Sequence, residues 1–422
     1  MRFLILTIAL CLLSTFILLI FKSKPNALSF IKGFFAYHFV SGNDSWKAMI
    51  GAIELIKKAP DKQVYDALFG SGIKFQYPLS SLLLFDGAKT ITGASYVNIA
   101  YWLDRISAVC VFLFSFFSAK ILICTLKVQG IARMTVNSKT EVRLIYFLVL
   151  VLTFLFYPIL RSYGLGQIQT IITLLTAIAI YCWQHNKKAF TGIIFGFICL
   201  IKPQLGLLFL WGAIRKQWKM VIPGLSIVAI FSLISAYLYG FNNNLYYLKV
   251  LSFLSQRGES FFANQSVNGL LNRVIFNGNN LEWDGKFPDF NPLVYYGTLT
   301  TSLILMIGGL LWRLKNDYPS VIELSIMILC TTMASPIAWE HHYAIVFTIF
   351  LLMIPYMHTF YKDKVWTLLL FVIGYVLVSQ YYQFVNTFAD TRWNILQSHL
   401  FIGACILLFF LFRVSWKFKK QE

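Results

Sequence analysis

Long apolar runs recur throughout this chain of 422 residues, and they constrain its fold more than any other feature. A helix needs roughly 20 mostly apolar residues to cross about 30 Å of hydrocarbon. Two short runs, 189–201 and 204–214, flank Lys202-Pro203 and predict a hairpin of short helices, because proline cannot continue the first helix. The other runs that reach or approach spanning length are 3–21, 100–124, 143–160, 167–183, 220–239, 293–312, 319–335, 341–357, 365–381 and 396–412. Together they predict an all-α polytopic membrane protein with about 12 transmembrane helices.

The composition excludes a soluble domain, because 58% of the residues are hydrophobic and only 13% are charged. Soluble domains are about 45–50% apolar and about 25% charged. The net charge of +19 lies in short clusters between the apolar runs, which indicates membrane topology rather than nucleic-acid binding. All seven cysteines lie in or beside apolar runs, without a CxxC pair. We therefore expect no disulfide framework and no metal site.

The distribution of charge predicts which side each loop occupies. We expect the first run to be an uncleaved anchor, because its apolar stretch is too long for a signal peptide. With a cytoplasmic N-terminus and twelve crossings, the inner segments carry a net charge of +14 and the outer segments +5. This positive-inside pattern predicts a multi-pass protein of the plasma membrane with both termini cytoplasmic. The lysine-rich stretch 22–78 votes for the opposite orientation, but long loops cross the membrane largely regardless of charge.

Two long extracytoplasmic loops are expected, at 22–98 and 240–292, within a single integral membrane domain spanning 1–422. The first loop contains an amphipathic stretch in which Trp46, Met49 and Ile53 recur at helical spacing, with lysines on the opposite face. This pattern predicts an amphipathic helix lying in the plane of the lipid headgroups.

Polar motifs gather on the predicted outer side. They are Asp44, Tyr65-Asp66, "FQYPLSSLL" from Phe75, "GLGQIQTIITLL" from Gly164, "GIIFGFICLIKPQLGLLFL" from Gly192, "NQSVNGLLNR" from Asn264 and "SPIAWEHHYAIVF" from Ser335. In this order, over residues 44–343 of a polytopic chain, the series resembles glycosyltransferase family 87. These are bacterial polyprenol-phosphate-mannose-dependent α-mannosyltransferases of the GT-C fold. The chain departs from the family in having Tyr-Pro-Leu where Tyr-Pro-Pro is common, and in its lysine-rich first loop.

The resemblance implies that Asp44 is the general base, since GT-C enzymes place a carboxylate in the first outer loop. An acceptor hydroxyl is a poor nucleophile until a positioned base takes its proton. The phosphate leaving group departs without protonation, so one carboxylate suffices. The alternative is that Asp44 caps the helix that begins at Ser45-Trp46. Glu340 is the alternative base.

Lys202 and Arg273 are candidates to hold the donor phosphate. Arginine offers a planar fork to phosphate, and lysine a point charge. A lysine between two short apolar helices is expensive unless it faces a polar cavity. The alternatives are snorkelling of Lys202 to the interface and anchoring of Arg273 to lipid headgroups.

His341 and His342 follow Trp339 at the outer start of a predicted helix. An imidazole there could bind the phosphate or orient Asp44. We expect only one of the two to face the site, because adjacent helical residues point about 100° apart. The alternative is a pair of interfacial aromatic residues.

Hydrogen-bonding and aromatic side chains in the same motifs are candidates to bind the sugar substrates. Polar residues of this kind equally cap helix ends. The candidates are Tyr77, Gln167, Asn264, Gln265, Trp339 and Glu340.

The sequence predicts an inverting glycosyltransferase that moves a sugar, mannose by resemblance, from a polyprenyl-phosphate to a hydroxyl of a lipid or glycan acceptor. Neither GxGxxG nor DxD occurs, so no nucleotide-sugar site and no cofactor are expected. The alternatives are a transporter or flippase of lipid-linked sugars, favoured by the broken hairpin at Lys202-Pro203, and a glycan polymerase or ligase. The motifs do not define the acceptor or the oligomeric state.

Overall fold

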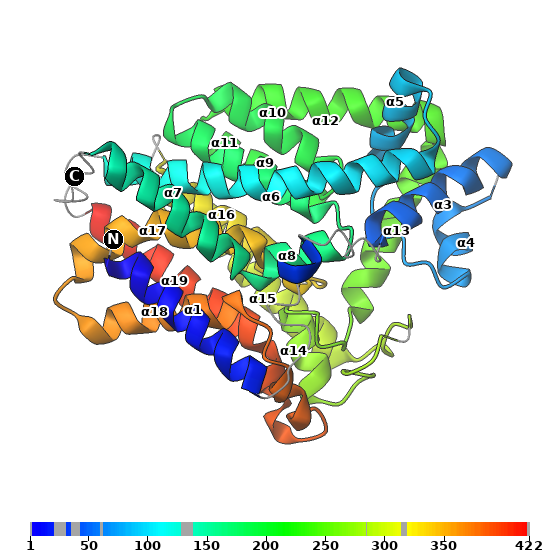
Figure 1. Ribbon diagram of the computed structural model, residues 1–422. Coiled ribbons are helices and arrows are strands. Elements are labelled where there is room, and N and C mark those ends of the chain that lie inside the picture. The colour runs from blue at the N-terminus through cyan, green and yellow to red at the C-terminus, as the bar shows by residue number, and fades with distance from the viewer. Residues whose placement is uncertain are drawn as a thin grey trace.

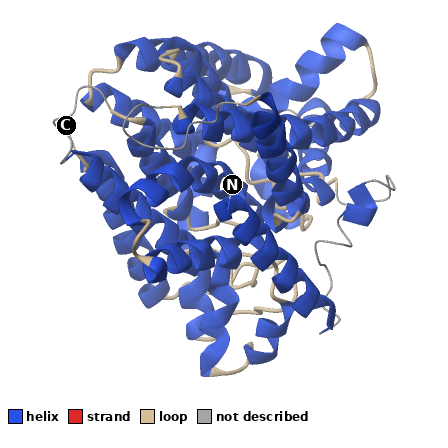
Figure 2. Cartoon of the chain, turned by 60° about the vertical axis from the view of Figure 1, so that its left-hand side comes forward, coloured by secondary structure: helices blue, strands red, loops and turns tan. Residues whose placement is uncertain are grey.

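The computed structural model describes residues 2–20, 31–34, 43–59, 62–127, 138–283, 285–313 and 319–419. Within these ranges the chain is helical or irregular, and extended pairing is limited to one isolated bridge between Asn264 and Trp339 (Figure 2). The expected all-α class is therefore confirmed.

The helices follow one another with short connections, and η denotes a short 3-10 helix. In chain order they are α1 (Arg2–Ile20), α3 (Asp44–Lys58), α4 (Val64–Gly70), η1 (Leu79–Leu82), α5 (Leu83–Thr92), α6 (Tyr96–Leu126), α7 (Lys139–Phe154), α8 (Tyr157–Gly164), α9 (Gln169–Gln184), α10 (Lys188–Cys199), η2 (Pro203–Gly206), α11 (Leu207–Ile214), α12 (Trp218–Tyr239), α13 (Phe241–Arg257), α14 (Val267–Val274), α15 (Pro292–Leu311), α16 (Val321–Met333), η3 (Glu340–Ile345), α17 (Val346–Tyr361), α18 (Val365–Ser379), η4 (Gln383–Phe388), η5 (Arg392–Ser398) and α19 (His399–Lys419).

Apolar helices follow all twelve predicted runs, so the protein is a multi-pass membrane protein. Their lengths differ from the expectation of about 12 full spans. Among the described residues, six segments are long and apolar enough to cross a membrane, and a bent pair would make a seventh. The remaining apolar helices, α9, α10, η2 with α11, α16 and α18, are shorter than a full span. The six are Phe3–Ile20, Tyr96–Leu126, Trp218–Tyr239, Pro292–Leu311, Glu340–Tyr361 and Arg392–Lys417.

The spanning segments differ in how deeply they are buried. The segment Glu340–Tyr361 is 83% buried and forms the centre of the bundle, whereas the windows in α12 and α15 are only 17% buried. The apolar side chains that these two peripheral helices expose need lipid around them, because water would not tolerate so large an apolar surface. The two ends of the bundle also differ: α1 begins and α19 ends at one end, and the helices of the two long loops gather at the other (Figure 1).

The run 143–160, expected as one helix, is broken. α7 ends at Phe154, and α8 begins at Tyr157 at an angle of 61° to it. Pro158 lies in the first turn of α8. Proline is tolerated there because the first N–H groups of a helix have no partner within it, but it cannot continue a helix from the preceding turn. The break turns α8 across the bundle to pack against η3.

The hairpin expected around Lys202-Pro203 is present. α10 ends at Cys199, Pro203 opens η2, and α11 returns the chain to the end of the bundle where α10 began, because residues near Lys188 and Trp218 line one small cavity there. Glycines make the packing of α10 on α12 possible. A Cβ atom at Gly192 would lie 1.9 Å from the Met220 carbonyl oxygen. Small residues at such spacing let the backbones of membrane helices come close together.

The predicted amphipathic helix of the first long loop is α3. Its apolar face, however, is covered by protein rather than by lipid headgroups: Trp46, Met49 and Ile53 are fully buried, against α4 and η1 among other elements. The helical pattern was correctly interpreted, but periodicity does not distinguish a lipid surface from a protein partner. Lys22 and Lys24, which lie in the same predicted loop, are outside the described residues.

We predict that Gly192→Leu separates α10 from α12, because the new side chain would overlap the α12 backbone. Overpacking of this kind destabilises by about 1–3 kcal/mol or more. The measurement is the thermal unfolding temperature of the purified protein in lipid nanodiscs. Gly308→Leu on α15 is the matched control, since a Cβ there meets no atom within 4 Å. Equal losses in the two variants would contradict the packing assigned to Gly192.

Candidate functional site

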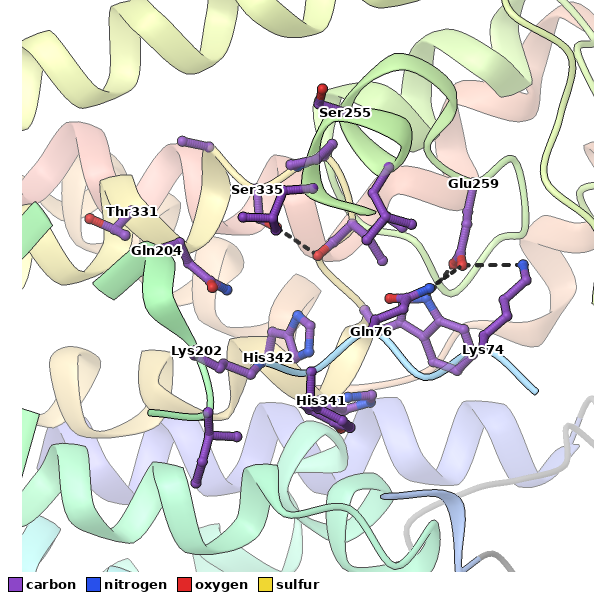
Figure 3. A pocket seen from close by; sticks show the side chains of 18 of the residues that line it. Lys74, Gln76, Lys202, Gln204, Ser255, Glu259, Thr331, Ser335, His341 and His342 are labelled. Atoms are coloured by element: carbon purple, nitrogen blue, oxygen red, sulfur yellow. Dashed lines mark hydrogen bonds and ion pairs between the residues drawn. The ribbon is translucent and has the colours of Figure 1, made fainter. Parts of the chain in front are cut away.

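A cavity of about 310 Å³ opens at the end of the bundle where the long loops gather. Its walls come from α3, the segment before η1, the α10–α11 turn, α13, α16 and the loop before η3. In Figure 3, Lys202 and Gln204 lie on one side of the His341–His342 pair, and Lys74, Gln76 and Glu259 lie on the other. Of the predicted site residues, those that line the cavity are Asp44, Tyr77, Gln167, Lys202, Trp339, His341 and His342.

Asp44 is the first residue of α3, and its backbone N–H donates to the Leu165 carbonyl oxygen at 3.0 Å. Its carboxylate Oδ2 accepts a hydrogen bond from Gln167 Nε2 at 2.5 Å. The residue in the capping position is Asn43. The interpretation of Asp44 as a helix cap is therefore wrong, and its carboxylate faces the cavity.

Gln167 is held so that its amide nitrogen points to Asp44. Its Oε1 accepts hydrogen bonds from the Ser45 hydroxyl at 2.8 Å and the Tyr77 hydroxyl at 3.2 Å. Ser45 Oγ in turn accepts from the Ile168 backbone N–H at 3.1 Å. Because both hydroxyls occupy the amide oxygen, only the NH₂ group is left for the carboxylate. Gln167 and Tyr77 thus position Asp44, in addition to lining the cavity.

The position of this carboxylate also depends on Gly166, which has φ 66°. Few residues other than glycine adopt this left-handed conformation without strain. A Cβ atom at Gly166 would lie 3.0 Å from the Asn43 backbone nitrogen. The turn after α8 and the start of α3 are therefore in direct backbone contact.

Arg161 supplies a positive charge that the sequence interpretation missed. Burial raises the pKa of Asp44, while the Gln167 hydrogen bond and the charge of Arg161 oppose that rise. Arg161 also interacts electrostatically with Glu340. A single arginine at the end of an otherwise apolar run was the available signal, but the bend between α7 and α8 that turns it toward both carboxylates was not predictable from spacing.

Lys202 lies in the turn between α10 and η2 and reaches the cavity wall. Its ammonium makes no hydrogen bond or ion pair with any described residue, and burial lowers its pKa to about 7. An unpaired cation in a partly apolar cavity favours an anionic ligand.

Both His341 and His342 line the cavity, so the expectation that only one of them would face it is wrong. Their ring centroids are 4.6 Å apart, with the planes nearly perpendicular. They lie in η3, a tight turn around which the cavity wraps, rather than on one face of a long helix. His341 Nδ1 is buried without a hydrogen-bond partner among the described residues.

Glu340, the alternative base, lies behind the cavity wall. Its Oε2 accepts a hydrogen bond from the Tyr157 hydroxyl at 2.7 Å, and only 2% of the residue is exposed. Trp339 lines the cavity, and its indole N–H donates to Glu259 Oε2 at 2.6 Å. Asp44 is therefore the better placed of the two proposed bases.

Three predicted site residues hold the loop that follows α13 rather than lining the cavity. Arg273 is fully buried and donates to the carbonyl oxygens of Ser260, Phe261 and Asn264, as well as to Ser398 Oγ at 2.7 Å. Asn264 Nδ2 donates to the Pro336 oxygen at 3.1 Å, and its Oδ1 accepts from the Ala338 N–H. Gln265 Nε2 donates to the Gln397 carbonyl oxygen at 2.7 Å. Lys202 is thus the predicted phosphate ligand that the structure places at the cavity.

Glu259 and Lys74 are a second missed pair. The Lys74 ammonium lies 3.4 Å from Glu259 Oε1, and both side chains line the cavity. Burial raises the pKa of Glu259, while the Lys74 charge and the Trp339 indole oppose that rise. The sequence gave no pairing signal, because the two residues are 185 positions apart.

No group of three or more His, Cys, Asp or Glu side chains suited to a metal ion occurs in the part of the chain that the structure describes. The expected absence of a metal and of a cofactor stays a prediction.

Comparison with known proteins identifies the family. Residues 75–336, more than half of the chain, match the model of glycosyltransferase family 87. The chain belongs to glycosyltransferase family 87. The matched segment includes Gln167, Lys202 and Glu259, whereas Asp44 precedes it and the histidine pair follows it.

This family 87 glycosyltransferase also resembles a curated protein over a shorter stretch. A segment of 106 residues is 33% identical to an alpha-(1->3)-arabinofuranosyltransferase of Corynebacterium glutamicum. The segment covers 25% of this chain and 24% of that protein, so the match spans about a quarter of the relative's length.

We predict that Gly166→Ala lowers glycosyl transfer by about 10²-fold, because displacement of a catalytic group by about 1 Å has an effect of this size. Gly93→Ala is the matched control: Gly93 has φ 68°, but a Cβ there meets no atom within 4 Å. Backbone strain of about 1–2 kcal/mol is expected in both variants. The measurement compares unfolding temperature with turnover. Equal turnover in the two variants would show that Gly166 does not position Asp44.

Proposed function

We propose that the protein transfers a sugar from a polyprenyl-phosphate donor to a hydroxyl of a lipid or glycan acceptor on the extracytoplasmic side of the membrane. The observation that carries this proposal is a single cavity with an aligned carboxylate, Asp44, and an unpaired cation, Lys202, beside two imidazoles. A carboxylate can activate the acceptor, and a cation can hold the phosphate. Membership of family 87 supports a glycosyltransferase with this division of tasks.

The apolar part of the cavity supports a lipid-linked donor. Leu207 of α11, Leu251 and Leu254 of α13, and Met306 of α15 line it. α12 and α15, which flank this region in the chain, expose most of their apolar residues and therefore face lipid. A polyprenyl chain could lie against these side chains while its phosphate reaches Lys202. A soluble nucleotide sugar would leave the apolar wall without a role.

In the proposed reaction Asp44 accepts the proton of the acceptor hydroxyl as its oxygen bonds to the anomeric carbon. The bond between that carbon and the phosphate oxygen breaks at the same time, and the electron pair leaves with the polyprenyl phosphate. Lys202, with hydrogen bonds from His341 or His342, stabilises the added negative charge. A β-linked donor then gives an α-linked product by inversion. No step requires a metal ion.

The donor sugar has two candidates. Mannose follows from the resemblance in the sequence motifs, and an arabinofuranosyl group follows from the name of the curated relative. The protein reconstituted in liposomes and given labelled polyprenyl-phosphate mannose or arabinofuranose would distinguish them. Transfer to an added acceptor supports glycosyl transfer, movement of label across the bilayer without transfer supports a flippase, and growth of long products supports a polymerase or ligase.

The location in the plasma membrane and the cytoplasmic position of both termini are part of the same proposal. They rest on the charge split between the loops. The arrangement agrees with both ends of the described chain lying at the end of the bundle opposite the cavity (Figure 1).

The first prediction concerns the base. Asp44→Asn keeps the shape of the side chain but cannot accept a proton, so we expect turnover to fall by about 10²–10⁴ with little change in donor affinity. Asp66→Asn is the control, because Asp66 accepts a hydrogen bond from Tyr246 at 2.6 Å and does not line the cavity. Near-wild-type turnover of Asp44→Asn, together with loss of activity in Glu340→Gln, would assign the base to Glu340.

The second prediction concerns pH. With a pKa of about 7, Lys202 loses its charge in the free enzyme as the pH rises through neutrality. We therefore expect the donor KM to rise above about pH 7, and we expect Lys202→Arg to abolish this rise, because a guanidinium stays charged. The measurement is donor KM across neutrality, with Lys89→Arg as an exposed control. The same rise in Lys202→Arg as in the wild type would exclude Lys202 as the phosphate ligand.

A further inference from the structure

A second cavity of about 270 Å³ adjoins the one described above. It lies in the second long loop, between residues 259–261 and 277–289. Glu259 and Trp283 line both cavities, so the two share a wall. A molecule bound in the second cavity would thus lie next to the carboxylate and aromatic groups of the first.

An aromatic platform forms part of the shared wall. The Trp283 ring meets Trp339 at a centroid distance of 5.0 Å and an angle of 84°, and it lies 5.7 Å from Phe261. The Lys74 ammonium is 3.8 Å from the centre of the Trp283 ring. Trp283 is nevertheless 42% exposed. An indole fixed by its neighbours and left partly open offers a flat apolar surface to a ligand.

The polar groups of the second cavity suit hydroxyls rather than phosphates. Asn277, Asn279, Glu282 and Asp289 bring amides and carboxylates to the lining. The Glu282 carboxylate makes no hydrogen bond or ion pair with the described residues, whereas the nearby Lys74 is paired with Glu259. Carboxylates accept hydrogen bonds from hydroxyl groups but repel an anionic ligand.

We propose that this second cavity binds the acceptor, and that the acceptor presents a neutral saccharide whose apolar ring face packs on Trp283. Glu282 and Asn279 accept and donate hydrogen bonds to its hydroxyls. This inference rests on the proposed glycosyl transfer, since it names the class of the second substrate. It follows from the aromatic platform, the surplus of carboxylates and the shared wall with the cavity that contains Asp44.

The experiment uses the full-length protein in nanodiscs with octyl α-mannoside carrying a photoreactive diazirine. We expect the cross-link to map to residues 277–289, and labelling to fall about 3- to 10-fold in Trp283→Ala, the range expected for loss of an aromatic contact. Trp283→Phe keeps an aromatic face and should retain most of the labelling, which preserves the test if the alanine variant does not fold. Trp393→Ala is the matched control, because Trp393 is an exposed tryptophan that lines neither cavity.

Glu282→Gln should likewise reduce labelling, and an excess of unlabelled octyl mannoside should compete with the probe. Labelling that maps elsewhere, or that is equal in Trp283→Ala and the wild type, would overturn the acceptor site. Transfer from the polyprenyl-phosphate sugars is measured separately on the same preparations. Specific labelling without transfer from either donor would overturn the proposed function and leave a saccharide site, whereas transfer with unchanged labelling in Trp283→Ala would overturn only this inference.

Discussion

A backbone that leaves its helix inside a membrane bundle must find new hydrogen-bond partners, since lipid supplies none. Three breaks in this chain meet that requirement with side chains from distant segments. The Leu155 carbonyl accepts from Gln380 Nε2 at 3.0 Å, and the Leu200 carbonyl accepts from Ser80 Oγ at 2.6 Å. The Pro336 carbonyl accepts from Ser266 Oγ at 2.8 Å. The second and third breaks carry cavity-lining residues directly, and the first turns α8 toward Glu340, so the constraint on the backbone also shapes the site.

The same requirement governs the charges. Arg273 is buried but surrounded by carbonyl oxygens, and Glu259 is buried but receives hydrogen bonds from Lys74 and Trp339. Such partners offset the large free-energy cost of removing a charge from water. Lys202 has no such partner among the described residues. The distinction separates charges that hold the fold from the one that is available to a ligand, and residue type or neighbouring sequence does not reveal it.

Much of the candidate site was nevertheless predictable. Asp44, Gln167, Lys202, Trp339 and the histidine pair were selected because polar residues at the outer ends of apolar helices have few structural reasons to be there, and the cavity brings them together. The prediction failed for Arg273, Asn264 and Gln265, which belong to an equally polar motif. Their side chains bind backbone carbonyls of segments 70 or more positions away, or of a loop folded back on α14, and no local pattern records those contacts.

The sequence by itself determined the solvent, the secondary structure and the chemical equipment of one end of the molecule. Apolar runs of membrane length are a local property, and so are the proline at the α10–α11 turn and the lysine beside it. The tertiary structure alone decided that α3 packs on protein rather than on headgroups, that α8 bends by 61° to bring Arg161 toward Asp44 and Glu340, and that Glu259 pairs with Lys74. Each of these outcomes depends on which surface meets which across the bundle, and that choice is made by packing and desolvation summed over many distant residues.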